Sequence, residues 1–125
     1  MSAQPQRSKY GFSRTVDISF DAAIEKTRAA LKEEGFGVLS EIDIKEKLKE
    51  KLDVDFRRYT ILGACNPSLA YKTLQEELEI GLLLPCNVIV YETATEQSVV
   101  AAMAPLAALG VVGANPALQE VAREA

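Results

Sequence analysis

Residues 86–103 read CNVIVYETATEQSVVAAM, and this stretch decides the fold. Two apolar runs, 86–91 and 98–103, flank a polar turn at 93–97, which is typical of two strands joined by a short connection. Both runs are apolar at odd and even positions alike. A strand with one solvent-exposed face instead alternates apolar and polar residues. We therefore expect something to cover both faces of this sheet. The candidates are the C-terminal segment and a second copy of the chain.

The part of the chain before this stretch mixes further strands with helices. Alternation over residues 12–20 predicts a half-buried strand, in which Arg14 is the exception on the apolar side. Apolar residues at helical spacing predict a helix over 21–34, capped by Ser19 or Asp21 and stopped by Gly35. The remaining predicted elements are a strand at 36–42, a short amphipathic helix at 43–52 with Asp43 in the capping role, and a strand at 54–64.

Asn66-Pro67 predicts the start of another helix, because Asn caps free backbone N–H groups and Pro fits the first turn. We expect this helix to end at Gly81. A second Asn-Pro pair, Asn115-Pro116, predicts a similar start near the C-terminus. The expected inner face of the first of these helices consists of Ala70, Tyr71, Leu74 and Leu78.

These elements predict an α+β fold, with a mostly antiparallel sheet and helices packed on one face. The chain has 125 residues, which suits one domain with a core of its own. We expect residues 1–10 to form a flexible N-terminal arm and residues 11–125 to form the single domain.

Charge and composition exclude several classes of function. The net charge is −4, and only Lys72 and Arg123 of the 14 basic residues lie beyond residue 58, so nucleic acid is not expected as a partner. The absence of histidine removes the commonest metal ligand and the usual general base, and no cofactor or metal is expected. Residues 1–10 lack a secretory h-region, and prolines and glycines interrupt the uncharged segment 97–119, so we expect a cytoplasmic protein that does not bind membranes.

Two Cys-Asn pairs, Cys65-Asn66 and Cys86-Asn87, carry the candidate chemistry. Each pair stands at the boundary of a predicted strand, and Cys65 directly precedes a predicted helix N-terminus. Such a position favours the thiolate, because the helix dipole and free N–H groups stabilise negative charge. A thiolate there could carry a persulfide, sense oxidants or hold a small anion beside it. The alternative is that both thiols simply pack, as buried free cysteines often do.

Arg58 is the candidate cation of this site, since an arginine binds a carboxylate or phosphate well. The alternative is that Arg57 and Arg58 belong to the open, charged face of a strand, together with Asp53 and Asp55. No combination of residues at a diagnostic spacing assigns an enzymatic reaction, and whether the protein is an enzyme stays open.

Three phrases resemble one known family: EGFGVLSEID at 34–43, YTILGACNP at 59–67 and IGLLLPCNV at 80–88. They closely resemble the domain of unknown function 302 family, in the same order and over roughly residues 12–125. The resemblance implies a small α+β domain similar to the TATA-binding-protein-like fold, often a homodimer, without implying DNA binding. The signature positions, none of them with a demonstrated role, are Cys65, Asn66, Pro67, Leu84, Pro85, Cys86 and Asn87.

The sequence therefore predicts a homodimeric module that binds a small anionic or thiol-reactive ligand, or handles sulfur, with Cys65 and Cys86 at its centre. The competing hypothesis is a structural or protein-interaction domain with no chemistry of its own. On the first hypothesis Cys65 reacts faster than Cys86. Both hypotheses allow a homodimer.

Overall fold

The computed structural model describes residues 6–7 and 11–103. Ten elements follow one another along this part of the chain. They are β1 (Gln6–Arg7), β2 (Gly11–Val16), α1 (Phe20–Glu33), β3 (Gly37–Asp43), α2 (Ile44–Leu52), β4 (Tyr59–Cys65), α3 (Pro67–Glu76), the 3₁₀-helix η1 (Leu78–Leu83), β5 (Cys86–Ala94) and β6 (Gln97–Met103).

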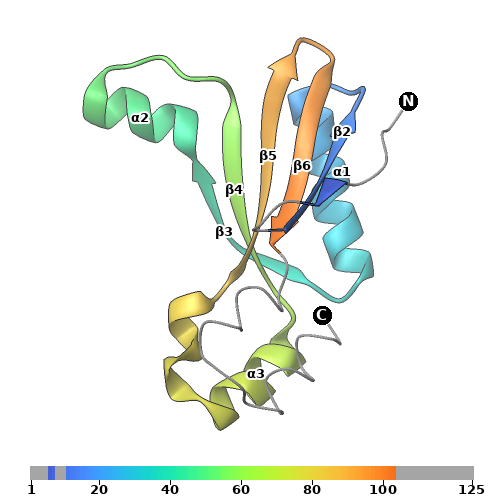
Figure 1. The fold of residues 1–125 in the computed structure, drawn as a ribbon, viewed down its shortest axis with the longest axis vertical. Coiled ribbons are helices and arrows are strands. Elements are labelled where there is room, and N and C mark those ends of the chain that lie inside the picture. The colour runs from blue at the N-terminus through green and yellow to red at the C-terminus, as the bar shows by residue number, and fades with distance from the viewer. Residues whose placement is uncertain (1–5, 8–10, 104–125) are drawn as a thin grey trace.

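The strands form one antiparallel sheet with the order β1-β2-β6-β5-β4-β3. The predicted α+β fold with an antiparallel sheet is confirmed. Figure 1 shows α1 along one side of the sheet, α2 beyond one end of β4, and α3 with η1 beyond the other end. The two ends of β4 therefore lie in different surroundings, which matters for the candidate site.

Helix α1 forms the first part of the core. The Ser19 side chain caps the helix by accepting a hydrogen bond from the backbone N–H of Ala22. The buried side of α1 packs against Val90 of β5, and its buried members are Phe20, Ala23 and Ile24. Gly35 follows the C-terminal end of α1 and has a φ of +84°, the left-handed conformation that glycine adopts at no steric cost.

A second cluster fills the same side of the sheet nearer α3. It consists of Leu62 and Ala64 from β4 with Val88 from β5, and Leu31 of α1 packs against it. Leu62 is fully buried and stands directly opposite Val88 in the β4–β5 register. This cluster fixes how β4 and β5 lie against each other.

The opposite side of the sheet, called the outer face below, is built from two rows of residues in direct register. One row is Ile61, Ile89 and Ala101, and the other is Tyr59, Tyr91 and Val99. Val99 is buried and the others are half-buried. The expectation that β5 and β6 are apolar on both sides of the sheet is thus borne out within the described residues.

Several predicted boundaries are corrected by the structure. The strand expected over 12–20 ends at Val16, and Phe20 already belongs to α1, because Ser19 caps the helix there. The strand expected from residue 54 begins at Tyr59. The helix expected to reach Gly81 ends at Glu76 and is followed by η1.

The predicted inner face of α3 is partly wrong. Tyr71 and Leu78 are exposed, with 66% and 83% of their surface accessible, and Thr73 is the residue that α3 buries. The Thr73 hydroxyl satisfies its hydrogen bond within the helix by donating to the carbonyl of Leu69. The second Asn-Pro start at Asn115-Pro116 lies outside the described residues, as does most of the expected N-terminal arm, of which Gln6–Arg7 pair with β2.

Candidate functional site

The antiparallel pairing of β4 and β5 brings the two Cys-Asn pairs, Cys65-Asn66 and Cys86-Asn87, to one end of the sheet. Ala64 lies opposite Cys86 and Gly63 lies opposite Asn87, so Cys65 follows the residue that pairs with Cys86. Both cysteines are half-buried free thiols. Two phrases that are about 20 residues apart in sequence thus meet where β4 enters α3 and η1 leads into β5.

Cys65 is the last residue of β4, and Asn66 caps α3 directly behind it. The Asn66 side-chain oxygen accepts a hydrogen bond of 3.2 Å from the backbone N–H of Leu69, and Pro67 occupies the first turn. The predicted Asn-Pro helix start is confirmed. The thiol of Cys65 therefore belongs to a residue adjacent to the positive end of the α3 dipole.

The Cys86 thiol has a pKa raised above its ordinary value, first by burial and second by the neighbouring Cys65. Burial disfavours the charged thiolate, and a second thiolate nearby would repel it. Cys86 consequently holds its proton to higher pH than an ordinary cysteine thiol does. Its neighbour in sequence, Asn87, is exposed.

Pro85 and Gly63 make the closest contact in this corner. A Cβ added to Gly63 would lie 2.7 Å from Cγ of Pro85 and 2.3 Å from Oγ of Ser40, distances that real Cβ atoms do not show. The Leu84–Pro85 peptide bond is cis. Glycine at position 63 is therefore required by the close approach of β3 and Pro85 to β4.

Arg58 is not brought to the cysteines. It precedes β4, seven residues before Cys65, which is about 23 Å along an extended chain. Its guanidinium pairs with Asp21 at 2.5 Å and lies 4.4 Å above the ring of Phe20. Arg58 thus connects the start of α1 with the α2 end of the sheet.

Aromatic residues gather at this same α2 end. The rings of Tyr59 and Tyr91 stack with centroids 5.4 Å apart, and Phe56 lies beside Tyr59. Burial, and secondarily Tyr91, raises the pKa of Tyr59. Arg57 lies 6.0 Å above the Tyr91 ring. These contacts fill the end of the outer face with aromatic surface.

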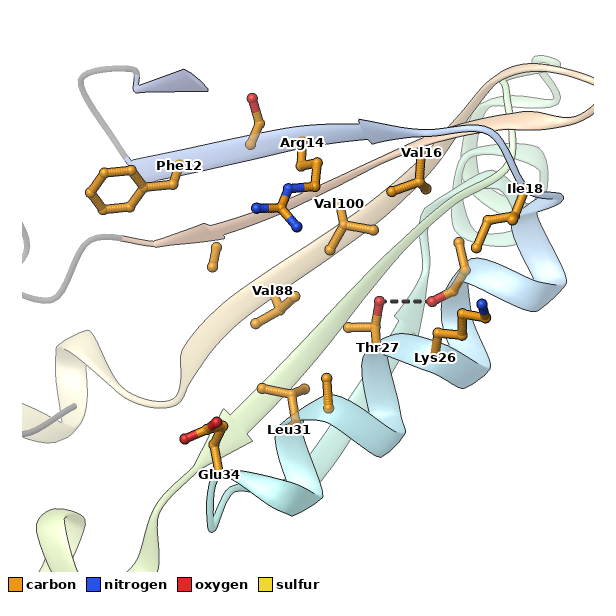
Figure 2. Close-up of a pocket in the computed structure, with 14 residues that line it drawn as sticks. Phe12, Arg14, Val16, Ile18, Lys26, Thr27, Leu31, Glu34, Val88 and Val100 are labelled. Carbon is orange, nitrogen blue, oxygen red and sulfur yellow. Dashed lines mark hydrogen bonds between the residues drawn. The ribbon is translucent and has the colours of Figure 1, made fainter. Parts of the chain in front are cut away.

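A groove of about 510 Å³ between α1 and the sheet was missed by the sequence analysis as a site. Figure 2 shows Arg14 reaching from β2 into this space among apolar side chains such as Val88 and Val100. The available signal was the single charged residue on the apolar side of an alternating strand. Periodicity alone could not reveal that α1 leaves a space there.

The described residues contain neither a cluster of metal-ligating side chains nor a helix that could span a membrane. Across residues 6–7 and 11–103, no cluster of three or more cysteine, aspartate or glutamate side chains is placed to hold a metal ion. In the same part of the chain, no helix combines the length and apolar character needed to cross a bilayer.

Comparison with known proteins identifies the family. Residues 12–125 match the family described as domain of unknown function DUF302. A crystal structure of an uncharacterized conserved DUF302 protein from Bacillus stearothermophilus is similar, with 37% identity, a TM-score of 0.76, and coverage of 90% of this chain and 88% of that one. No curated protein matches. On the family match and this structural similarity, the chain belongs to the DUF302 family.

Proposed function

We propose that the protein is a small thiol-handling module in which Cys65 is the reacting thiol and Cys86 is its neighbour. The observation that carries the proposal is the β4–β5 register, which sets Ala64 opposite Cys86 and so puts two free thiols at one end of the sheet. Position supports different roles for them. Cys65 adjoins the N-terminus of α3, while burial holds the proton on Cys86.

The chemistry that suits this pair is sulfur transfer from a small persulfide. The Cys65 thiolate attacks the outer sulfur of R–S–SH, so that a Cys65–sulfur bond forms and the S–S bond of the ligand breaks. The products are a persulfide on Cys65 and the thiolate of R, and no external oxidant is needed. The partial positive charge at the α3 N-terminus stabilises the Cys65 thiolate before this step and the thiolate of R as it forms.

Cys65 is expected to react with iodoacetamide faster than Cys86 in the native protein. The thiolate is the nucleophile, and the raised pKa of Cys86 keeps that thiol protonated up to higher pH. Labelling of Cys86 should therefore begin at a higher pH than labelling of a free thiol in the unfolded chain. Timed alkylation between pH 6 and 10, followed by peptide mass mapping, measures both rates.

The single variants Cys65→Ser and Cys86→Ser serve as matched controls for this experiment. Incubation with a low-molecular-weight persulfide should add one sulfur atom to wild type and to Cys86→Ser, and none to Cys65→Ser, as read by intact mass. Equal and slow labelling of both thiols, or sulfur loading that survives Cys65→Ser, contradicts the proposal.

A homodimer built on the outer face is the second candidate function, and it corresponds to an interaction domain. The rows Ile61–Ile89–Ala101 and Tyr59–Tyr91–Val99 support it, because the open face of an antiparallel sheet is normally polar. A second copy of the chain would present the same rows about a two-fold axis. Ile89 lies at the centre of the outer face, with Ile61 on one side and Ala101 on the other.

Ile89→Asp is expected to convert the dimer to a monomer at micromolar concentration, because a buried carboxylate in an apolar interface is strongly unfavourable. Light scattering after size exclusion measures the mass, and circular dichroism checks that the variant remains folded. Leu52→Asp, on an exposed position of α2, is the control that should remain dimeric. A monomeric wild-type protein would rule out this candidate and leave the thiol proposal unaffected.

A further inference from the structure

We propose that the groove between α1 and the sheet binds a small amphipathic carboxylate, with its anionic head on Arg14 and its hydrocarbon part along the apolar walls. This site is separate from the cysteine corner, and the proposal does not depend on the thiol chemistry. It rests on the shape of the groove, the nature of its walls and the state of Arg14.

The groove arises because α1 packs on β5 and β6, while β2 lies on the far side of β6. Its volume of about 510 Å³ falls within the range of small-molecule sites. Figure 2 shows the helix below and β2 above this space, with Leu31 and Val88 between them. The main apolar wall residues are Val16, Ile18, Leu31, Val88 and Val100.

Arg14 is the cationic group that extends into this apolar space. It pairs with Val100 in the β2–β6 register and stands between Phe12 and Val16 on the same side of β2. Arg14 is itself exposed, and it is the one charged residue of β2 on the side of the sheet where apolar side chains line the groove. The guanidinium offers a fork of donors that matches a carboxylate.

Three arginines, Arg28, Arg57 and Arg58, have polar partners, whereas Arg14 has none within the part of the chain that the structure describes. Arg28 pairs with Glu41, Arg58 pairs with Asp21, and Arg57 donates a hydrogen bond of 3.5 Å to the carbonyl of Glu92. Within residues 6–7 and 11–103, no carboxylate forms an ion pair with Arg14. The donors of Arg14 are therefore available to a ligand.

Charges around the groove favour an anion over a cation. Arg14 and Lys26 contribute two positive charges to the lining, and Glu34 contributes one negative charge. The groove is thus locally positive in a chain whose net charge is −4. Thr27 does not compete for the ligand as a donor, because its hydroxyl donates to the carbonyl of Ala23 at 2.7 Å. A soluble monocarboxylate with a hydrocarbon tail suits this groove, because its carboxylate matches the positive charge and its tail matches the apolar lining.

The test is binding of decanoate to the full chain, measured by calorimetry and by methyl NMR. Wild type should bind decanoate, with shifts centred on the methyl groups of Val88 and Val100, and should bind the neutral analogue 1-decanol at least 10-fold more weakly. Arg14→Met should weaken decanoate binding about 10-fold or more, and Arg14→Lys should weaken it less. Cys65→Ser should bind as wild type does.

Arg57→Met is the matched control, since it removes the same charge from the α2 end of the sheet, and it should leave decanoate binding unchanged. Equal affinity of Arg14→Met and wild type overturns the proposal, as does equal affinity for decanol. Shifts centred on Ile89 and Ala101 of the outer face also overturn it. Failure of wild type to bind decanoate overturns it as well.

Discussion

Leu62→Ala is expected to lower the free energy of unfolding by about 3 kcal/mol, within the range of about 2–5 kcal/mol for such truncations. Leu62 has no accessible surface and lies in β4 between two neighbouring strands. Truncation removes its contacts with Ala64 and Val88 and leaves a space that the paired strands cannot close. Urea unfolding at a fixed chain concentration measures the change.

Leu52→Ala is the matched control for this truncation. The same chemical change is made at a position with 66% of its surface exposed, in a helix that buries none of its residues. Alanine also has a slightly better helix propensity than leucine, so the change in unfolding free energy should stay within about 0.5 kcal/mol. Equal urea midpoints for the two variants would contradict the position of Leu62 at the centre of the core.

Gly63→Ala is expected to cost about 1–3 kcal/mol, because the added methyl group overpacks a site that has no space for it. The contacts are Oγ of Ser40 at 2.3 Å and Cγ of Pro85 at 2.7 Å. Ser40 can rotate its hydroxyl away, but the ring of Pro85 is fixed to the backbone and can withdraw only if β5 shifts. Thermal and urea unfolding measure the loss.

Gly81→Ala and a double mutant identify the cause of this loss. A Cβ at Gly81 meets nothing within 4 Å, so that substitution should change the unfolding free energy by less than about 0.5 kcal/mol. Adding Ser40→Ala to Gly63→Ala should recover part of the loss, since the clash with Pro85 remains. Full recovery, or equal effects at the two glycines, would contradict the described packing around Gly63.

Local hydrogen-bonding chemistry is what the sequence predicts best in this chain. Asn66 and Asp43 cap their helices as expected, each accepting a hydrogen bond from the backbone N–H three residues ahead. Gly35 takes the left-handed conformation expected of a helix stop. Such features depend on a few neighbouring residues, so the pattern of side chains along the chain is sufficient to identify them.

Features that depend on distant parts of the chain were not predictable in the same way. Arg58 pairs with Asp21, 37 residues away, and this pairing follows from the sheet order rather than from any local pattern. Tyr71 satisfies the helical spacing of an inner face and is nevertheless exposed, because spacing does not say which side of a helix meets a neighbour. The groove beside Arg14 exists because α1 packs mainly on β5 and β6, and this packing cannot be read from a local pattern.

Strand β2 has β6 for its main partner, and this has a consequence during protein synthesis. The hydroxyl of Ser98 in β6 donates to the carbonyl of Ile18 across 80 residues of sequence. At about 5–20 residues per second, a ribosome needs roughly 4–16 s to add that length of chain. Until then β2 and α1 have emerged without the strand that joins them to the rest of the sheet. The nascent chain therefore passes through a stage in which the apolar side chains of β2 and α1 are available to chaperones.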